Sequence, residues 1–191
     1  MTAAVAITLL VAYLAGAFEQ RGKIRADDVC RSLPNRKEAA EIFNSVLPRA
    51  ASYDFDMRSS PIQDWHYNSN CFVKGDGKDL LLSLHANAVA TVSWQKWADH
   101  ELPPTSNGKL TDFNAGLKGL STPRMAAIYV PCYSSERESK DPWSLTVFAQ
   151  APSGLEGSDK EARQTLIKLA TEFGRYVHHE AKCDLPSKLP S

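Results

Sequence analysis

The sequence lacks an excess of charge of either sign. Lys and Arg together number 22, Asp and Glu together also number 22, and the formal net charge is zero. A protein that follows nucleic-acid backbones needs a basic excess to neutralise phosphates, so this composition argues against nucleic acid as a partner. Charged residues make up 23% of the chain and hydrophobic residues 43%, a balance typical of a globular protein.

Short catalytic motifs are also missing. The chain has no G-x-S-x-G, no P-loop, no H-E-x-x-H and no G-x-G-x-x-G. We therefore assign no catalytic residue and expect no cofactor. His66 and His85 are the best candidates for acid–base chemistry, next to Asp54, Asp56 or Asp64, although a structural histidine is the commoner reading of such a pattern. A small extracytoplasmic hydrolase stays open as an alternative.

Close pairs of metal ligands are absent as well. The four cysteines include no C-x-x-C pair, which disfavours a zinc site. The adjacent His178 and His179 point in different directions on a helix, so they form a poor metal pair. Four widely spaced cysteines behind an export-type N-terminus favour two disulfides instead.

Four cysteines allow three pairings, and spacing alone does not select one. We prefer Cys30 with Cys71, which fastens the segment before the first helix to the sheet. The second pair is then Cys132 with Cys183, which fastens the C-terminal tail to a strand. Four buried thiols in a cytoplasmic protein are the alternative.

One long run without any charge is present, at residues 2–18. It sits at the lower limit of about 17 apolar residues for a membrane-spanning helix. Ala15-Gly16-Ala17 also fits a signal-peptidase site, but no Lys or Arg precedes the run. Ala17 stands where a lipobox carries cysteine, which excludes a lipid anchor. We predict a retained membrane anchor, with secretion after cleavage near Ala17, or burial as a core helix, as alternatives.

The charges that follow this run conflict with the cysteines. Arg21, Lys23 and Arg25 favour a cytoplasmic position for the segment after the helix, whereas disulfides need an oxidising compartment. We place the domain outside the cytoplasmic membrane, which leaves these three charges unexplained. The expected plan is an anchor at 2–18, a charged linker at 19–29 and one domain at 30–191.

Periodicity predicts an α+β fold, an antiparallel sheet with packed helices (a sandwich), preceded by an N-terminal hydrophobic helix. Helices are expected at 35–47, at 91–100 and from Ser158, and capping boxes mark the first and the last of them. Gly75-Asp76-Gly77 predicts a hairpin turn, and Asn68-Ser69-Asn70 a turn or bulge. Strands are expected at 78–88, 125–132 and 143–151, with an irregular stretch at 101–124. In the first of these strands, Leu80, Leu82 and Leu84 should share a face, opposite Leu81, Ser83 and His85.

Trp94 and Trp97 are the best candidates for an exposed contact surface. Their spacing of three places them on one face of the expected short helix, and tryptophan is enriched at binding sites. The irregular stretch 101–124 would complete the surface. Two aromatic residues at helical spacing also fit a packed core.

Several short pieces of the chain carry a resemblance. They are D-D-V-C before the first helix, C-F-V at Cys71, G-L-K-G-L before a strand that ends in Y-V-P-C, and the closing C-D-L-P-S-K-L-P. With the N-terminal apolar segment, they make the chain resemble small membrane-anchored or secreted proteins of actinobacteria, particularly streptomycetes. It is also loosely similar to actinobacterial envelope lipoproteins and to extracellular sensor domains of kinases. The resemblance implies an α/β sandwich with cysteine bridges and supplies no catalytic residue.

Together these features predict a non-catalytic domain, held at the membrane by its N-terminal helix, that binds or senses an envelope component or a protein partner. A structural subunit of a membrane assembly is a third possibility, beside the hydrolase.

Overall fold

The computed structural model describes residues 21–60, 67–102, 109–133 and 143–190. Three helices are described: α2 (Arg36–Val46), α3 (Trp94–Glu101) and α4 (Asp159–Glu180). The strands are β1 (Tyr53–Ser60), β2 (Asn68–Gly75), β3 (Asp79–Ala90), β4 (Thr111–Phe113), β5 (Lys118–Thr122), β6 (Met125–Cys132) and β7 (Trp143–Gln150). The expected anchor at 2–18 and the loop at 134–142 lie outside the described residues. Within the described part of the chain, no helix is both long and apolar enough to cross a bilayer.

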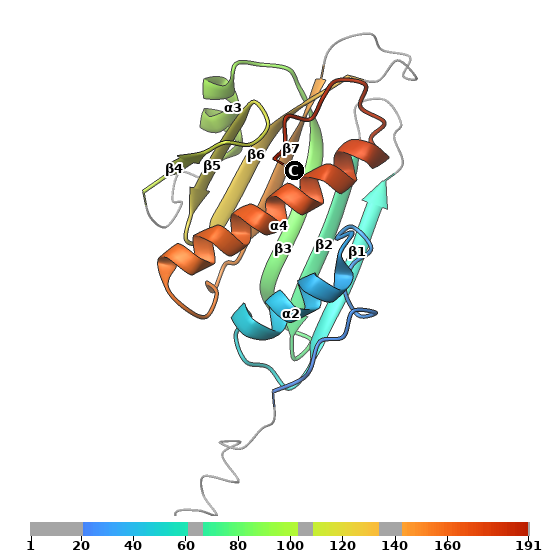
Figure 1. Ribbon diagram of the computed structural model, residues 1–191, viewed down its shortest axis with the longest axis vertical. Coiled ribbons are helices and arrows are strands. Elements are labelled where there is room, and N and C mark those ends of the chain that lie inside the picture. Colours follow the sequence, from blue (N-terminus) through green and yellow to red (C-terminus); the bar gives the residue numbers. More distant parts are fainter. Residues whose placement is uncertain (1–20, 61–66, 103–108, 134–142, 191) are drawn as a thin grey trace, which may run out of the picture.

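The strands form one seven-stranded antiparallel sheet in the order β1-β2-β3-β7-β6-β5-β4. Two meanders, β1–β3 and β4–β7, are joined where β3 pairs with β7, from Ser83 opposite Gln150 to Ala90 opposite Trp143. The long β1 and the three-residue β4 are therefore the two edges of the sheet (Figure 1). The predicted α+β fold with an antiparallel sheet and packed helices is confirmed.

Helices α4 and α2 cover one face of the sheet (Figure 1). Ser158 and Glu161 form the predicted capping box at the start of α4. The apolar residues that recur at helical spacing along this helix are all buried, namely Leu166, Leu169, Ala170, Phe173 and Val177. In α2 the apolar residues Ile42, Phe43 and Val46 recur at helical spacing; Phe43 is fully buried, and Ile42 and Val46 are half-buried. This face holds the main core.

The opposite face carries a smaller core under α3. Alternate residues of β6 and β7 point to this side, so Ala127, Tyr129 and Phe148 meet Trp97 there, whereas Ile128 and Val147 face α4. The helix thus covers only the half of this face formed by the second meander.

The hairpin between β2 and β3 has the predicted turn. Asp76 has a φ of 49° and Gly77 a φ of 70°, the conformation that tight hairpin turns require. The expected alternation along β3 is wrong at its start, because a register shift opposite Val73 and Lys74 breaks it. Leu81 and Leu82 are both buried as a result, and Leu80 is 37% exposed.

Both preferred disulfides are present: Cys30–Cys71 and Cys132–Cys183. The first joins the segment before α2 to β2. The second joins the end of β6 to Cys183, three residues after the end of α4. They close separations of 41 and 51 residues. Cross-links over such distances restrict the unfolded chain and stabilise a domain by about 2–4 kcal/mol each.

The described part of the expected linker, residues 21–29, belongs to the domain. Ile24 and Val29 are buried at 3% and 2% exposure, and the side-chain amide of Asn44 binds both the N–H and the carbonyl of Ile24. The linker prediction is wrong here because the charged residues of this segment flank two apolar residues, Ile24 and Val29, that pack into the core.

Two further expectations are corrected by the sheet. Residues 68–70 lie inside β2, where the cross-strand ladder to β1 and β3 overrides their turn propensity. The stretch 101–124 contains β4 and β5, which extend the sheet beyond β6. The C-terminal tail runs along the surface: Leu189 packs against Gly174, and Gly116 donates a hydrogen bond to the carbonyl of Lys188.

Candidate interaction surface

Trp94 is the first residue of α3, and its side chain is 40% exposed. Ser93 caps this helix by accepting a hydrogen bond from the N–H of Lys96. The loop before it is pinned by Tyr129, whose hydroxyl group accepts a hydrogen bond from the N–H of Val92 and donates one to its carbonyl. The tryptophan is therefore presented by a fixed helix start.

A cation from strand β5 lies over the indole ring of Trp94. Nζ of Lys118, in β5, is 4.4 Å from the ring centroid of Trp94 and 2.5 Å from Oδ2 of Asp112. The Lys118 side chain is only 19% exposed, because it lies between the aromatic ring and the carboxylate. Cation–π attraction and ion pairing both fix it there. We call Val92, Trp94, Asp112 and Lys118 the Trp94 surface.

A groove of about 410 Å³ adjoins this surface. It is lined by residues 112–118, and Asp112 and Lys118 belong to both features. Its rim carries Leu117, which is 41% exposed, and Val92 of the Trp94 surface is 39% exposed. An exposed tryptophan next to a groove and apolar neighbours has the composition of a contact site.

Trp97, the second tryptophan proposed for contact, is buried at 1% exposure. Its ring stacks on Tyr129 at 5.2 Å between centroids, and its Nε1 donates a 2.8 Å hydrogen bond to Oγ1 of Thr146. The expectation of exposure is wrong for this residue, because Trp97 packs on Tyr129 of β6, whereas Trp94 lies at the first position of α3, at the rim.

His85 lies on the same face of the sheet as Phe148 and stacks on it at 4.6 Å between ring centroids. Burial lowers the pKa of His85 to about 4, so its imidazole is neutral at neutral pH. No carboxylate of the described residues contributes to this shift, and Asp56 is paired with Arg58 at 2.6 Å. His66 and Asp64 lie outside the described residues.

The two C-terminal histidines lie in different environments. His178 shares a 2.8 Å hydrogen bond with the carbonyl of Leu185, and burial lowers its pKa. His179 is exposed and lies 3.5 Å from Glu180. Among the residues described, no three His, Cys, Asp or Glu side chains come together in a way that would hold a metal ion.

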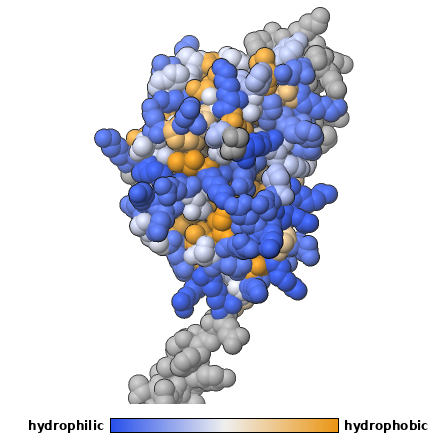
Figure 2. Space-filling model, in the orientation of Figure 1, coloured by the Kyte–Doolittle hydropathy of each residue, from blue (hydrophilic) through white to orange (hydrophobic). Residues whose placement is uncertain are grey.

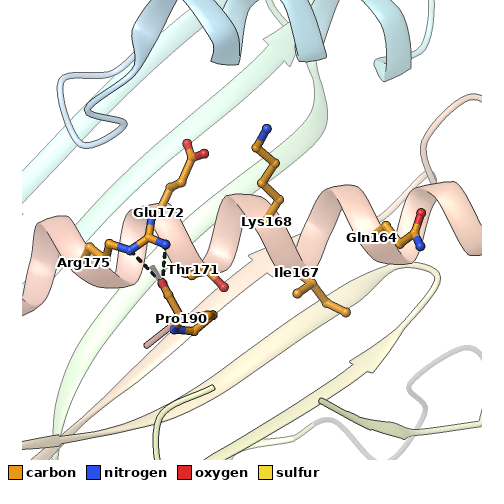
Figure 3. A pocket seen from close by; sticks show the side chains of 7 residues that line it. All are labelled: Gln164, Ile167, Lys168, Thr171, Glu172, Arg175 and Pro190. Carbon is orange, nitrogen blue, oxygen red and sulfur yellow. Dashed lines mark hydrogen bonds between the residues drawn. The ribbon is translucent and has the colours of Figure 1, made fainter. Parts of the chain in front are cut away.

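A second groove, of about 420 Å³, runs along the outer side of α4 beside Pro190 (Figure 3). Arg175 turns toward Pro190 and donates hydrogen bonds to its carbonyl, and Lys168 pairs with Glu38. Both cationic side chains that line this groove are thus already bound to other groups of the chain. Burial, and then the charge of Glu38, raise the pKa of Glu172.

Two polar atoms at this groove lack a hydrogen-bond partner among the described residues, Oγ1 of Thr171 and Oε2 of Glu172. The side of the molecule that carries α4 is predominantly hydrophilic, with apolar side chains in small separate groups (Figure 2). No aromatic anchor lines the groove. The Trp94 surface has one, and it is the stronger candidate for macromolecular contact.

Sequence reasoning found Trp94 but missed its neighbours Asp112 and Lys118. They lie 18 and 24 residues further along the chain, and no local pattern connects them to α3. Comparisons of the chain with protein-family models, with curated proteins and with solved structures give no match. The assignment of a function therefore depends on the geometry described above.

Proposed function

We propose that this chain is a non-catalytic binding domain displayed outside the cytoplasmic membrane, attached there by residues 2–18, and that the Trp94 surface holds its partner. The partner is a protein or another component of the cell envelope. The observation that carries the proposal is an exposed tryptophan fixed beneath a lysine ammonium group, next to a groove, on a domain closed by two disulfides.

The disulfides support the location. All four cysteines are paired and no free thiol is present. Such bridges form and persist in oxidising compartments and are rare in the cytoplasm. Mass spectrometry of the native protein without reductant tests this part, since it reports the cysteine state and the N-terminus together. An intact residue 2 supports the anchor and a start at Phe18 supports secretion, whereas four free thiols would overturn the location.

The exposed apolar side chains at the Trp94 surface support a contact role over catalysis. Trp94, Val92 and Leu117 each expose about two fifths of their surface. Tryptophan contributes strongly when a partner desolvates it. The competing hydrolase reading depends on a histidine next to a carboxylate, and His85 is stacked on Phe148 instead. A structural subunit of a membrane assembly would use the same surface, but its partner would be bound permanently.

Photo-crosslinking in the native cell envelope tests the contact surface. A photoreactive amino acid replaces Trp94 or Leu117 in one set of strains and Lys160, an exposed residue at the start of α4, in the control strain. We expect a discrete cross-linked species from positions 94 and 117 and none from position 160. Identical patterns from all three positions, or none from 94 and 117, would overturn the proposal.

A further inference from the structure

Strand β1 is a long edge strand protected only by charge. It is eight residues long, and it pairs with β2 without any register shift, from Tyr53 opposite Gly75 to Ser60 opposite Asn68. It contains no proline, lysine or bulge, so charged side chains are the one feature it has of those with which edge strands commonly prevent further pairing. The opposite edge, β4, has three residues and is protected by its shortness.

The outer side of β1 is free within the described chain. In the described residues, β2 is the only strand that pairs with it, and no other main-chain group binds the backbone of residues 53–60. Its core-facing side chains Phe55 and Met57 are half-buried, because the main core ends at this edge. An added strand would cover both the backbone groups and these apolar side chains.

The side chains of β1 complement a second copy of the same strand. Asp54, Asp56 and Arg58 share the face that points away from the core, because Phe55 and Met57 pack into it. A symmetric antiparallel pair with its two-fold axis at Met57 places Asp56 opposite the partner's Arg58, and this pair occurs twice. The ion pair between Asp56 and Arg58 within each strand then becomes part of a cluster of four alternating charges. Met57 then meets the partner's Met57 on the core side, next to Phe55.

The neighbouring symmetric registers are electrostatically less favourable. An axis at Asp56 or at Arg58 puts two like charges directly opposite each other, and an axis at Phe55 sets Asp54 against the partner's Asp56. A shift by one residue would place core-side residues opposite polar ones. Charge and the side-chain period together therefore select the register about Met57.

We infer that this chain forms a two-fold symmetric dimer through antiparallel pairing of β1 with β1 of a second copy, in the register centred on Met57. The two sheets join into one continuous sheet. Because β1 and β5 lie at opposite ends of the strand order, both Trp94 surfaces stay free at the outer ends of the dimer. The inference does not depend on the proposed function.

Cysteine cross-linking tests the register in the full chain, in membranes or mild detergent. Met57→Cys places two thiols opposite each other across the axis, within about 4.5–5.5 Å between Cβ atoms. Ser59→Cys is the control, because its counterpart lies four residues away along the strands, at roughly 13 Å. We expect a disulfide-linked dimer from the first variant and mainly monomer from the second on a non-reducing gel. Equal yields, or none from Met57→Cys, would overturn the inference.

Charge reversal provides an independent measurement by sedimentation of the otherwise unmodified chain. Asp56→Arg and Arg58→Asp should each weaken dimerisation by on the order of tenfold or more. The double variant should restore it, and a mixture of the two single variants should form heterodimers. Asp54→Arg is the matched control, because it faces the partner's Ser60 and should leave the dimer intact. A dimer unaffected by Asp56→Arg would exclude this register, and a monomeric native chain would exclude the interface.

Discussion

Nε1 of Trp97 donates a 2.8 Å hydrogen bond to Oγ1 of Thr146, in a site where both side chains are buried. This bond fastens α3 to the centre of the sheet, while Trp94, three residues earlier, stays at the rim. One tryptophan thus holds the helix in place, and the other is available for contact.

Replacement of Trp97 by Phe should destabilise the domain by about 2–4 kcal/mol, because the hydroxyl group of Thr146 loses its partner and a cavity remains. The matched Trp94→Phe variant should change the free energy of unfolding by less than about 0.5 kcal/mol, since Trp94 is exposed. Urea denaturation with disulfides intact measures both. Equal losses from the two variants would contradict the division of roles.

Stability should fall as the pH is lowered through the range in which an unfolded histidine takes up a proton. His85 has a folded pKa of about 4, compared with about 6.5 in the unfolded chain. Its contribution is thus complete above about pH 6.5 and is lost as the pH falls toward 4. Between pH 7.5 and 5 the loss should be about 2 kcal/mol. His178, whose pKa is also lowered, acts in the same direction.

Urea denaturation of the native chain and of His85→Asn at several pH values isolates this contribution, because the variant keeps a polar side chain without a titrating group. The variant should show a flatter dependence on pH, and an NMR titration should place the imidazole of His85 near pH 4. An identical slope for both proteins would refute the assignment.

Gly116 should tolerate alanine much less well than Gly77. Both have positive φ values, 62° and 70°, so alanine is strained at either position by about 1 kcal/mol. At Gly116 a Cβ would also overlap the main-chain oxygen of Tyr129, whereas at Gly77 the nearest atom, on Asp54, is 3.9 Å away. Thermal unfolding of the two variants should show a clearly larger loss for Gly116→Ala. Similar losses would contradict the close approach to β6.

Removal of either disulfide should cost about 2–4 kcal/mol, but with different local effects. Without Cys132–Cys183, the tail that places Lys188 against Gly116 and Leu189 against Gly174 loses its covalent attachment. Amide exchange at Gly116 should then rise, and it should stay low in a double alanine variant at Cys30 and Cys71. Equal exchange in the two variants would show that the tail does not hold this loop.

Local pattern predicted the elements with strong local signals. Ser158 and Glu161 cap α4, and the GDG sequence makes the hairpin turn, because both depend on residues within a few positions of one another. The predictions that failed depend on distant partners. Asn68, Ser69 and Asn70 have turn propensity but lie between two strands that satisfy their backbone groups.

The site shows the same division. The spacing of Trp94 and Trp97 predicted that they share a helix face but did not indicate which of them is exposed. No residue within α3 points to Lys118. The ion pair of Lys118 with Asp112 and its contact with the indole ring arise only because β5 pairs with β6, which places Lys118 opposite Tyr129.

The sequence by itself determined the class of fold, the cap and the apolar stripe of the last helix, and the expectation of two disulfides, because short-range periodicity and residue chemistry carry that information. Only the tertiary structure decided which tryptophan is buried, that residues 21–29 belong to the domain, and that β1 is left at an edge with opposite charges two residues apart. These features depend on which strands become neighbours, and strand order is set by packing across the whole sheet.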